Sequence, residues 1–200
     1  IIAEATAVEG RGRITPFDVG LWKDEQVVPL ARTVHFIKEQ GCVPGIQIAH
    51  AGRKASSLTT WEGGKLIAAG AGGWEPIAPS ALPFATSEPP PREMGSADLT
   101  RVCEAFARAT RRAVRLGVDA IELHAAHGYL LHTFLSPLAN RRGDRYGGSL
   151  ENRMRFPLEV FSAVRRAWPA AKPLLVKPRG GMRLSFSHVF TSTKLNDLPT

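Results

Sequence analysis

The sequence has 200 residues, of which 44% are hydrophobic and 22% are charged, a composition typical of a globular chain rather than a disordered one. Its apolar runs are too short to span a bilayer, so we expect no membrane role. The net charge of +8 does not indicate nucleic-acid binding, because the arginines are spread over predicted helix faces without interleaved aromatic residues. Solvated helix faces explain them better, although an anionic cofactor or substrate would also benefit.

The two cysteines, Cys42 and Cys103, lie far apart in the sequence and lack the spacing of a metal site. A disulfide framework is therefore not expected. We predict two buried thiols in a reducing compartment, and hence a cytoplasmic protein.

Apolar periodicity predicts strands that alternate with helices along the chain. The first helix should end at Gly41 and the second at Gly117, with Ser96 or Asp98 as the cap of the second; Ser149 should cap the third. The predicted strands span residues 1–8, 43–50, 118–124 and 173–176, and the predicted helices span residues 24–40, 99–117 and 149–168.

Each predicted helix is followed by the next strand after a short turn, which indicates repeated β/α units with a parallel sheet. A doubly wound sheet and part of an eight-stranded barrel both fit this order. No G-x-G-x-x-G motif follows any strand, which favours the barrel. Residues 51–98 form a long excursion rich in glycine and proline, and loops of this length are usually functional or mobile.

The stretch at residues 121–129 carries the candidate site. Apolar and polar residues alternate up to His124, which is the period of a strand, so the His124 imidazole should lie at the carboxyl end of that strand. A turn there would bring His127 and Tyr129 alongside. Imidazole and phenol donors suit a ligand oxygen that gains negative charge, and a phenol can also deliver a proton. The alternative is a polar strand end whose side chains are satisfied by their own loop.

Three co-ordered stretches resemble the old yellow enzyme family of flavin-dependent ene-reductases. They are GIQIAHAGRK at 45–54, ELHAAHGYL at 122–130 and YGGSLENR at 146–153. The segments EATAV at 4–8, GRIT at 12–15 and WEPIAPS at 74–80 look most like the bacterial xenobiotic reductase and NADPH dehydrogenase branch. The resemblance covers residues 1–176 and is more specific than any single short motif.

This resemblance implies a TIM barrel that holds FMN noncovalently, is reduced by NADPH and passes hydride to an activated alkene, either an α,β-unsaturated carbonyl or a nitro compound. It places Gln47 and Ala5 against the flavin. It also makes His124 and His127 ligands of the substrate oxygen, and Tyr129 the proton donor. Hydride addition generates enolate charge on that oxygen, so two imidazole donors would stabilise the transition state more than the ground state.

The chain departs from the family pattern at both ends. The family begins with a further strand before the position of Ile1, and it carries a flavin-contacting arginine where this chain has Lys177. We therefore expect a partial barrel of about strands 2 to 5 over residues 1–176, followed by a tail at 177–200 that does not match the family. Four strands would leave two open edges, so we expect this chain to bind FMN poorly.

Several roles stay open at this stage. Glu122 is predicted to face the barrel interior, either as the partner of a basic group or with a function of its own. Arg53 could meet a phosphate or substrate, although a structural pairing is the simpler reading, and Asn140 and its neighbours are expected to structure their loop. A metal enzyme using His124, His127 and His132 is a remote alternative, since the spacing is not H-E-x-x-H; we expect no metal. Homo-oligomerisation is left open.

Overall fold

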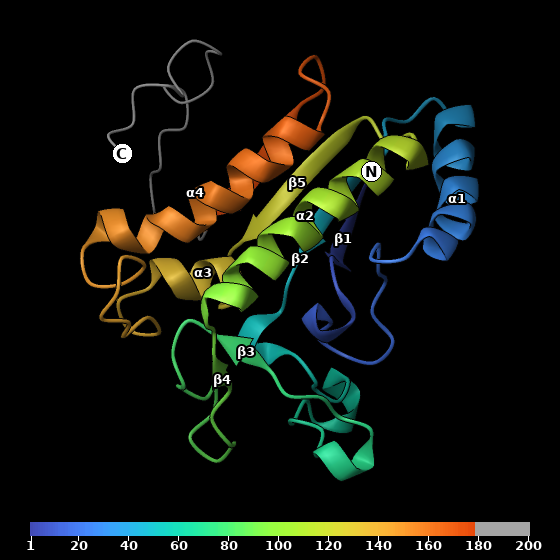
Figure 1. Cartoon of the computed structure of the whole chain (residues 1–200). Helices are drawn as coiled ribbons and strands as arrows, with labels where there is room; N and C mark the ends of the chain where they lie inside the picture. Colours follow the sequence, from blue (N-terminus) through green and yellow to red (C-terminus); the bar gives the residue numbers. More distant parts are fainter. Residues whose placement is uncertain (179–200) are drawn as a thin grey trace.

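The computed structural model describes residues 1–178, and a four-stranded parallel sheet forms its centre (Figure 1). The strands are β1 (Ile2–Ala7), β2 (Gly45–Ala49), β5 (Ala120–Ala125) and β6 (Leu174–Pro178), in that spatial order. β6 continues two residues beyond the predicted end at Val176, so Lys177 and Pro178 belong to the sheet rather than to a tail. The remainder of the predicted tail, residues 179–200, lies outside the described residues.

The sheet follows a simple sequential order in which each main strand pairs with the next one along the chain. A doubly wound sheet would reverse direction at a switch point, whereas a (β/α)₈ barrel adds strands in sequence order. The register places Gln47 opposite Glu122, and His124 opposite Lys177. The prediction of a partial TIM barrel is therefore confirmed by the strand order.

Three long helices connect these strands: α1 (Val27–Glu39), α2 (Ser96–Leu116) and α4 (Leu150–Ala167). α2 begins three residues before its predicted start, and its N-cap is Gly95, so the prediction of Ser96 or Asp98 as the cap is wrong. Asp98 contributes as the third helical residue, whose carboxylate accepts the Gly95 N–H at 3.1 Å. Gly117 ends the helix in the left-handed conformation, with φ of 84°, as predicted. Ser149 caps α4 by accepting a hydrogen bond from the Asn152 N–H.

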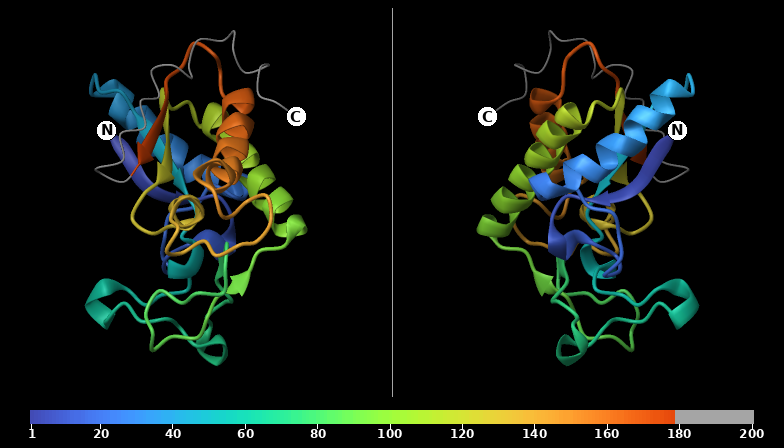
Figure 2. Two further views of the ribbon diagram at one scale, coloured as in Figure 1. Left: turned by 90° about the vertical axis from the view of Figure 1, so that its left-hand side faces the viewer. Right: turned by 90° about the vertical axis from the view of Figure 1, so that its right-hand side faces the viewer.

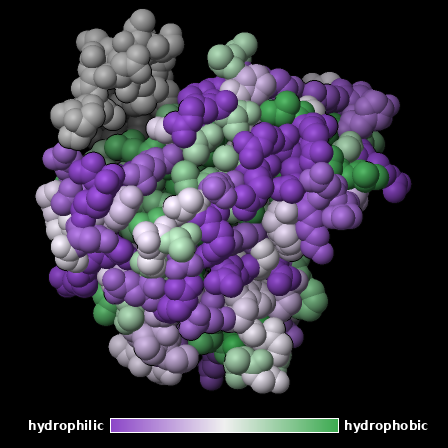
Figure 3. All heavy atoms as spheres, viewed as in Figure 1, coloured by the Kyte–Doolittle hydropathy of each residue, from purple (hydrophilic) through white to green (hydrophobic). Residues whose placement is uncertain are grey.

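α2 and α4 lie side by side on one face of the sheet, and the main core fills the space beneath them (Figures 1 and 2). Phe106 of α2 and Phe156 of α4 are fully buried there. The outer surface seen from this side is mostly hydrophilic, with hydrophobic patches between the helices (Figure 3). Within residues 1–178, no helix is long and apolar enough to cross a membrane.

α1 packs less deeply than the other long helices, and only Val34 is buried along it. The chain leaves α1 through an exposed turn, where the Cys42 side chain is exposed, while Cys103 on α2 is half-buried. The prediction of two buried thiols is therefore wrong for Cys42. The cause is its place between the end of a surface helix and the next strand.

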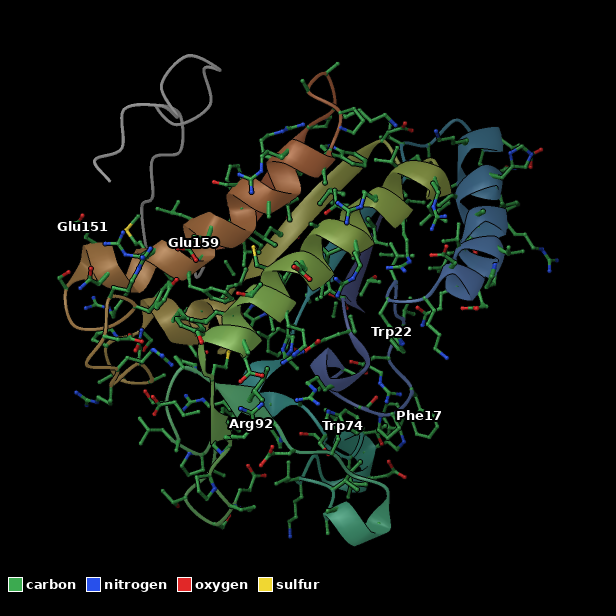
Figure 4. The ribbon with its side chains drawn as sticks, in the orientation of Figure 1. Phe17, Trp22, Trp74, Arg92, Glu151 and Glu159 are labelled. Atoms are coloured by element: carbon green, nitrogen blue, oxygen red, sulfur yellow. The ribbon has the colours of Figure 1, made fainter. Side chains whose placement is uncertain are left out.

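The excursion at 51–98 extends from the carboxyl ends of the strands (Figure 1). It contains short 3₁₀ turns and a two-stranded parallel ladder of β3 (Ile77–Ala78) and β4 (Arg92–Glu93). These strands are too short to be predicted from sequence periodicity. The Arg13 guanidinium lies over the rings of Trp22 and Trp74, at 5.4 and 4.7 Å from their centroids. Figure 4 labels both tryptophans, which join the loop after β1 to the excursion.

Candidate active site

The turn after β5 brings His124, His127 and Tyr129 together, as predicted. The His124 ring centroid lies 5.1 Å from that of His127 and 4.5 Å from that of Tyr129. His127 adopts a left-handed backbone with φ of 56°, which is uncommon for a residue with a side chain and marks a tight turn. Tyr129 is the N-cap of the short helix α3 (Leu130–Leu135), an element that was not predicted.

The hydrogen bonds of His124 define which of its ring nitrogens carries a proton. Its Nδ1 accepts the Ala126 N–H at 3.3 Å, which assigns the hydrogen to Nε2. Burial, followed by the nearby charges of His127 and Lys177, lowers the pKa of His124 to about 4. The ring is therefore neutral near pH 7, and its Nε2–H has no hydrogen-bond partner within residues 1–178. This N–H is therefore a donor with unused hydrogen-bonding capacity among the described residues.

Tyr129 has the protonation state that an acid needs. Burial raises its pKa above the ordinary value of a phenol, and the negative charges of Asp18 and Glu4 add to this rise. The Lys54 ammonium lies 5.8 Å from the centroid of the Tyr129 ring. The phenol consequently keeps its proton at neutral pH beside a neutral imidazole.

A hydrogen bond joins Gln47 and Ala5, the two residues predicted to contact a flavin. The register of β1 on β2 is interrupted between Ala3 and Thr6, and Ala5 has φ of 52° there. This irregularity turns the Ala5 N–H toward Gln47, whose Oε1 accepts it at 3.1 Å. The Gln47 Nε2 donates to the Glu122 carboxylate.

The Gln47 side-chain amide has an unused N–H that could donate a hydrogen bond to a flavin. Its side chain is 2% exposed, and an amide nitrogen carries two N–H groups. One N–H is held by Glu122, and no described residue accepts the other. A buried donor without a partner is costly, so a ligand oxygen or ring nitrogen at this position would satisfy it.

A comparison with protein-family models shows the family to which the chain belongs. The model of the NADH:flavin oxidoreductase / NADH oxidase family matches residues 1–195. The chain belongs to this family. These are the old yellow enzymes that the three sequence stretches predict, so that prediction is confirmed.

Relatives and solved structures agree with this membership. The chain is 48% identical over 180 residues to an NADH:flavin oxidoreductase of Gibberella zeae, covering 88% of this chain and 44% of the relative. It is 48% identical over 177 residues to an NADPH dehydrogenase of Geobacillus thermodenitrificans, covering 88% and 47%. A structure of morphinone reductase in complex with tetrahydroNAD superposes with a TM-score of 0.75 at 31% identity, covering 88% of this chain and 50% of that one. The chain thus spans about half the length of the relatives it matches.

Lys177 occupies the position at which the family resemblance predicts a flavin-contacting arginine. In β6 it is the register partner of His124, and its charge contributes to the low pKa of that imidazole. A lysine ammonium is a point charge, whereas an arginine offers a planar fork of donors. This strand therefore brings a cation to the site with a different geometry from the expected one.

The structure gives the hydrogen-bond partners of several residues whose roles the sequence left open. Glu122 pairs with the amide of Gln47 rather than with a basic group. Arg53 Nη1 donates to the Leu82 and Pro83 carbonyls, whereas its buried Nε has no hydrogen-bond partner within residues 1–178. Asn140 structures its loop by donating to two carbonyls, those of Phe134 and Tyr146.

The imidazole of His132, the third histidine of the metal alternative, is hydrogen-bonded to the backbone of its own turn. Its Nδ1 accepts the Gly128 N–H at 2.9 Å and so closes the turn before α3. Among residues 1–178 there is no group of three or more His, Cys, Asp or Glu side chains arranged to hold a metal ion.

Sequence reasoning missed a polar network that begins at the end of β2. His50, at the end of β2, is 1% exposed and lies 2.9 Å from the Glu9 carboxylate. Glu9 also binds Arg101, which in turn binds Asp98 on α2. Burial alone would raise the pKa of Glu9, but His50 and Arg101 lower it to about 2. The sequence signal was the position of His50 at the end of a strand, like His124.

Proposed function

We propose that the chain carries the substrate-binding and proton-donating part of an NADPH-dependent FMN oxidoreductase that reduces the C=C bond of α,β-unsaturated carbonyl or nitro compounds. The observation that carries this proposal is the neutral His124 ring, whose Nε2–H is free beside His127 and Tyr129. Family membership supports the redox chemistry, because the relatives are named NADPH dehydrogenase and NADH:flavin oxidoreductase.

The histidines would bind and polarise the substrate oxygen. A neutral Nε2–H of His124 donates a hydrogen bond that strengthens as enolate charge develops on that oxygen. His127 is exposed on the turn and would supply the second donor. Tyr129 would then give its phenolic proton to the α-carbon, and its raised pKa makes the O–H form available at neutral pH.

FMN, when bound, supplies the hydride that adds to the β-carbon, and NADPH restores it. The free N–H of Gln47 and the backbone around Ala5 would hold the flavin from this half of the protein. Lys177 would add a positive charge beside it. The nicotinamide preference is open, since the relatives are named after both NADH and NADPH.

The direct test is a two-step anaerobic experiment on the flavin-loaded protein. NADPH should bleach the flavin absorbance, and addition of 2-cyclohexenone should restore it with formation of cyclohexanone. Saturated cyclohexanone with no added alkene serves as the control and should leave the flavin reduced. Reoxidation by oxygen alone, with no response to the enone, would contradict the proposed substrate class.

A second candidate is a chain that keeps the family residues but does not retain FMN. The observation that favours it is Lys177, which cannot reproduce the bidentate contacts of an arginine. Purification followed by desalting separates the two candidates. A stoichiometric flavin spectrum after desalting supports the reductase, whereas a colourless protein with native-like circular dichroism supports the second candidate. A Lys177→Arg variant that gains flavin under the same conditions would identify the cause.

A further inference from the structure

His50 uses both of its ring nitrogens inside the protein. Nδ1 accepts the Gly52 N–H at 3.0 Å, and Nε2 lies 2.9 Å from Glu9 Oε1. A carboxylate accepts and does not donate, so the hydrogen is on Nε2 and the lone pair on Nδ1. The ring closes a turn from residue 50 to residue 52 and ties that turn to the loop after β1.

This turn touches the first residue of α3 through its backbone. The His50 carbonyl accepts the Leu130 N–H at 3.0 Å. Gly52, with φ of +62°, packs so closely that a Cβ there would lie 2.9 Å from the Leu130 Cα. Leu130 directly follows Tyr129. The turn after β2 therefore holds the residue next to Tyr129, although the two segments are far apart in sequence; the Tyr129 N–H itself donates to the Ala126 carbonyl at 3.1 Å.

The ring of His50 cannot shift without moving its neighbours. A Cβ on Gly12 would lie 2.9 Å from the His50 Cδ2, and the Gly12 carbonyl accepts the Ala51 N–H at 2.8 Å. Beyond Glu9, the ion pairs continue through Arg101 and Asp98 to Arg92, which Figure 4 labels near the start of α2. The loop after β1, the turn after β2 and the start of α2 thus form one support.

We propose that His50 is a positioning residue for Tyr129: its Nδ1 fixes the Gly52 amide, the resulting turn fixes Leu130, and Leu130 sets the place of the phenol against His124. The consequence for catalysis rests on the proposed function, whereas the positioning does not. The role belongs to Nδ1 rather than to the Nε2 that binds Glu9.

Two substitutions distinguish the role of His50 Nδ1 from that of His50 Nε2. Asn at position 50 places an oxygen near the site of Nδ1, and an Asn side chain readily accepts the N–H two residues on. Gln places its amide near the site of Nε2 and can still donate to Glu9, but it lacks the acceptor for Gly52. His50→Asn should therefore keep the turn, and His50→Gln should lose it.

The readout is the ring signals of ¹³C-tyrosine in NMR spectra of the full chain. The chain has only two tyrosines, so Tyr146, held by Glu159, is an internal control for general unfolding. Tyr129→Phe assigns the signals, and His35→Gln on the surface of α1 is the matched substitution control. His50→Gln should shift the Tyr129 signals and leave those of Tyr146 in place, while His50→Asn should leave both in place.

Three results would overturn the inference: unchanged Tyr129 signals in His50→Gln, equal shifts of Tyr129 in both variants, or joint shifts of both tyrosines in His50→Asn. The kinetic readout is separate. A misplaced acid should slow reoxidation of the reduced flavin by the enone up to about 10²-fold in His50→Gln, with reduction by NADPH unchanged. Shifted Tyr129 signals with normal reoxidation would retain the positioning role and contradict the proposed role of Tyr129.

Discussion

His50 directly follows β2, His124 is the last residue but one of the neighbouring strand β5, and the two side chains have similar hydrogen bonds at Nδ1 but different surroundings at Nε2. Both rings are buried, at 1% and 3% exposure, and in both Nδ1 accepts the backbone N–H two residues on. At β2, Nε2 is held by an ionised carboxylate. At β5, Nε2 is free among residues 1–178 and lies in a cluster with His127 and Tyr129. The far nitrogen decides whether a strand-end histidine is structural or available to a ligand.

The largest expected effect is on the reaction rate, and it should follow from removing the phenolic hydroxyl of Tyr129, whose ring lies beside that of His124. Tyr129→Phe should slow reoxidation of the reduced flavin by an enone by about 10²- to 10⁴-fold, the usual contribution of a general acid. Stopped-flow absorbance of the two half-reactions is the measurement. Reduction by NADPH should change little, and equal slowing of both half-reactions would show that Tyr129 is not the acid.

The next largest effect should be on phenol binding, through loss of the histidine N–H groups that donate to the ligand oxygen. His124→Asn keeps an acceptor for the Ala126 N–H but removes the Nε2–H, so the dissociation constant of a phenolic inhibitor should rise by about 10- to 100-fold. His127→Ala should weaken the same ligand. Titration of the flavin spectrum with the phenol measures both.

The matched substitution at the other strand end is His50→Asn, which should weaken phenol binding far less than His124→Asn. Equal weakening by the two variants would break the distinction between a structural and a ligand-binding histidine. Undiminished affinity in both His124→Asn and His127→Ala would refute the assignment of the oxygen site.

For the free energy of unfolding, we expect the larger loss from substitution of His50 and the smaller one from substitution of His124. His50→Ala removes one of the two partners of the part-buried Glu9 carboxylate, which keeps Arg101, and it leaves the Gly52 N–H without a partner. We expect a loss of about 1–3 kcal/mol in the free energy of unfolding. His124→Ala leaves only the Ala126 N–H, bonded at 3.3 Å, and should cost less. Urea unfolding followed by circular dichroism gives the comparison, and a larger loss for His124→Ala would contradict it.

The smallest effect is a pH dependence. The pKa of His124 is about 4 in the folded chain, below the ordinary value near 6.5, so the unfolded chain binds the proton more readily. The contribution of this group to stability should be complete above about pH 6.5 and decline as the pH falls toward 4. Urea midpoints at pH 7.5 and 5.0 should differ less in His124→Asn than in the original protein.

The sequence was sufficient for the parts of the fold that repeat over many residues. The four strands and three long helices have strong apolar periods, and Gly117 and Ser149 mark helix ends through their own backbone and side-chain chemistry. α3 was missed because six mostly apolar residues have no readable period. β3 and β4 span two residues each and depend on tertiary pairing.

The site was predictable where its residues are adjacent in sequence, as in the turn from His124 to Tyr129. The partners of Gln47 depend on the register of β1, β2 and β5, which joins residues more than forty positions apart. The left-handed Ala5 gave no signal, because alanine is a normal strand residue. The resemblance supplied the flavin roles of Gln47 and Ala5, and those roles stay predictions.

The close approach of Gly52 to Leu130 has a consequence for protein engineering. No side chain fits at position 52, since a Cβ would meet the backbone of Leu130 rather than a movable atom. The loop after β2 and the turn after β5 are therefore one interlocking part. A substrate-binding turn grafted from another family member would have to be transplanted together with its matching β2 loop, and single-loop exchanges at this end of the sheet should yield misfolded chimaeras.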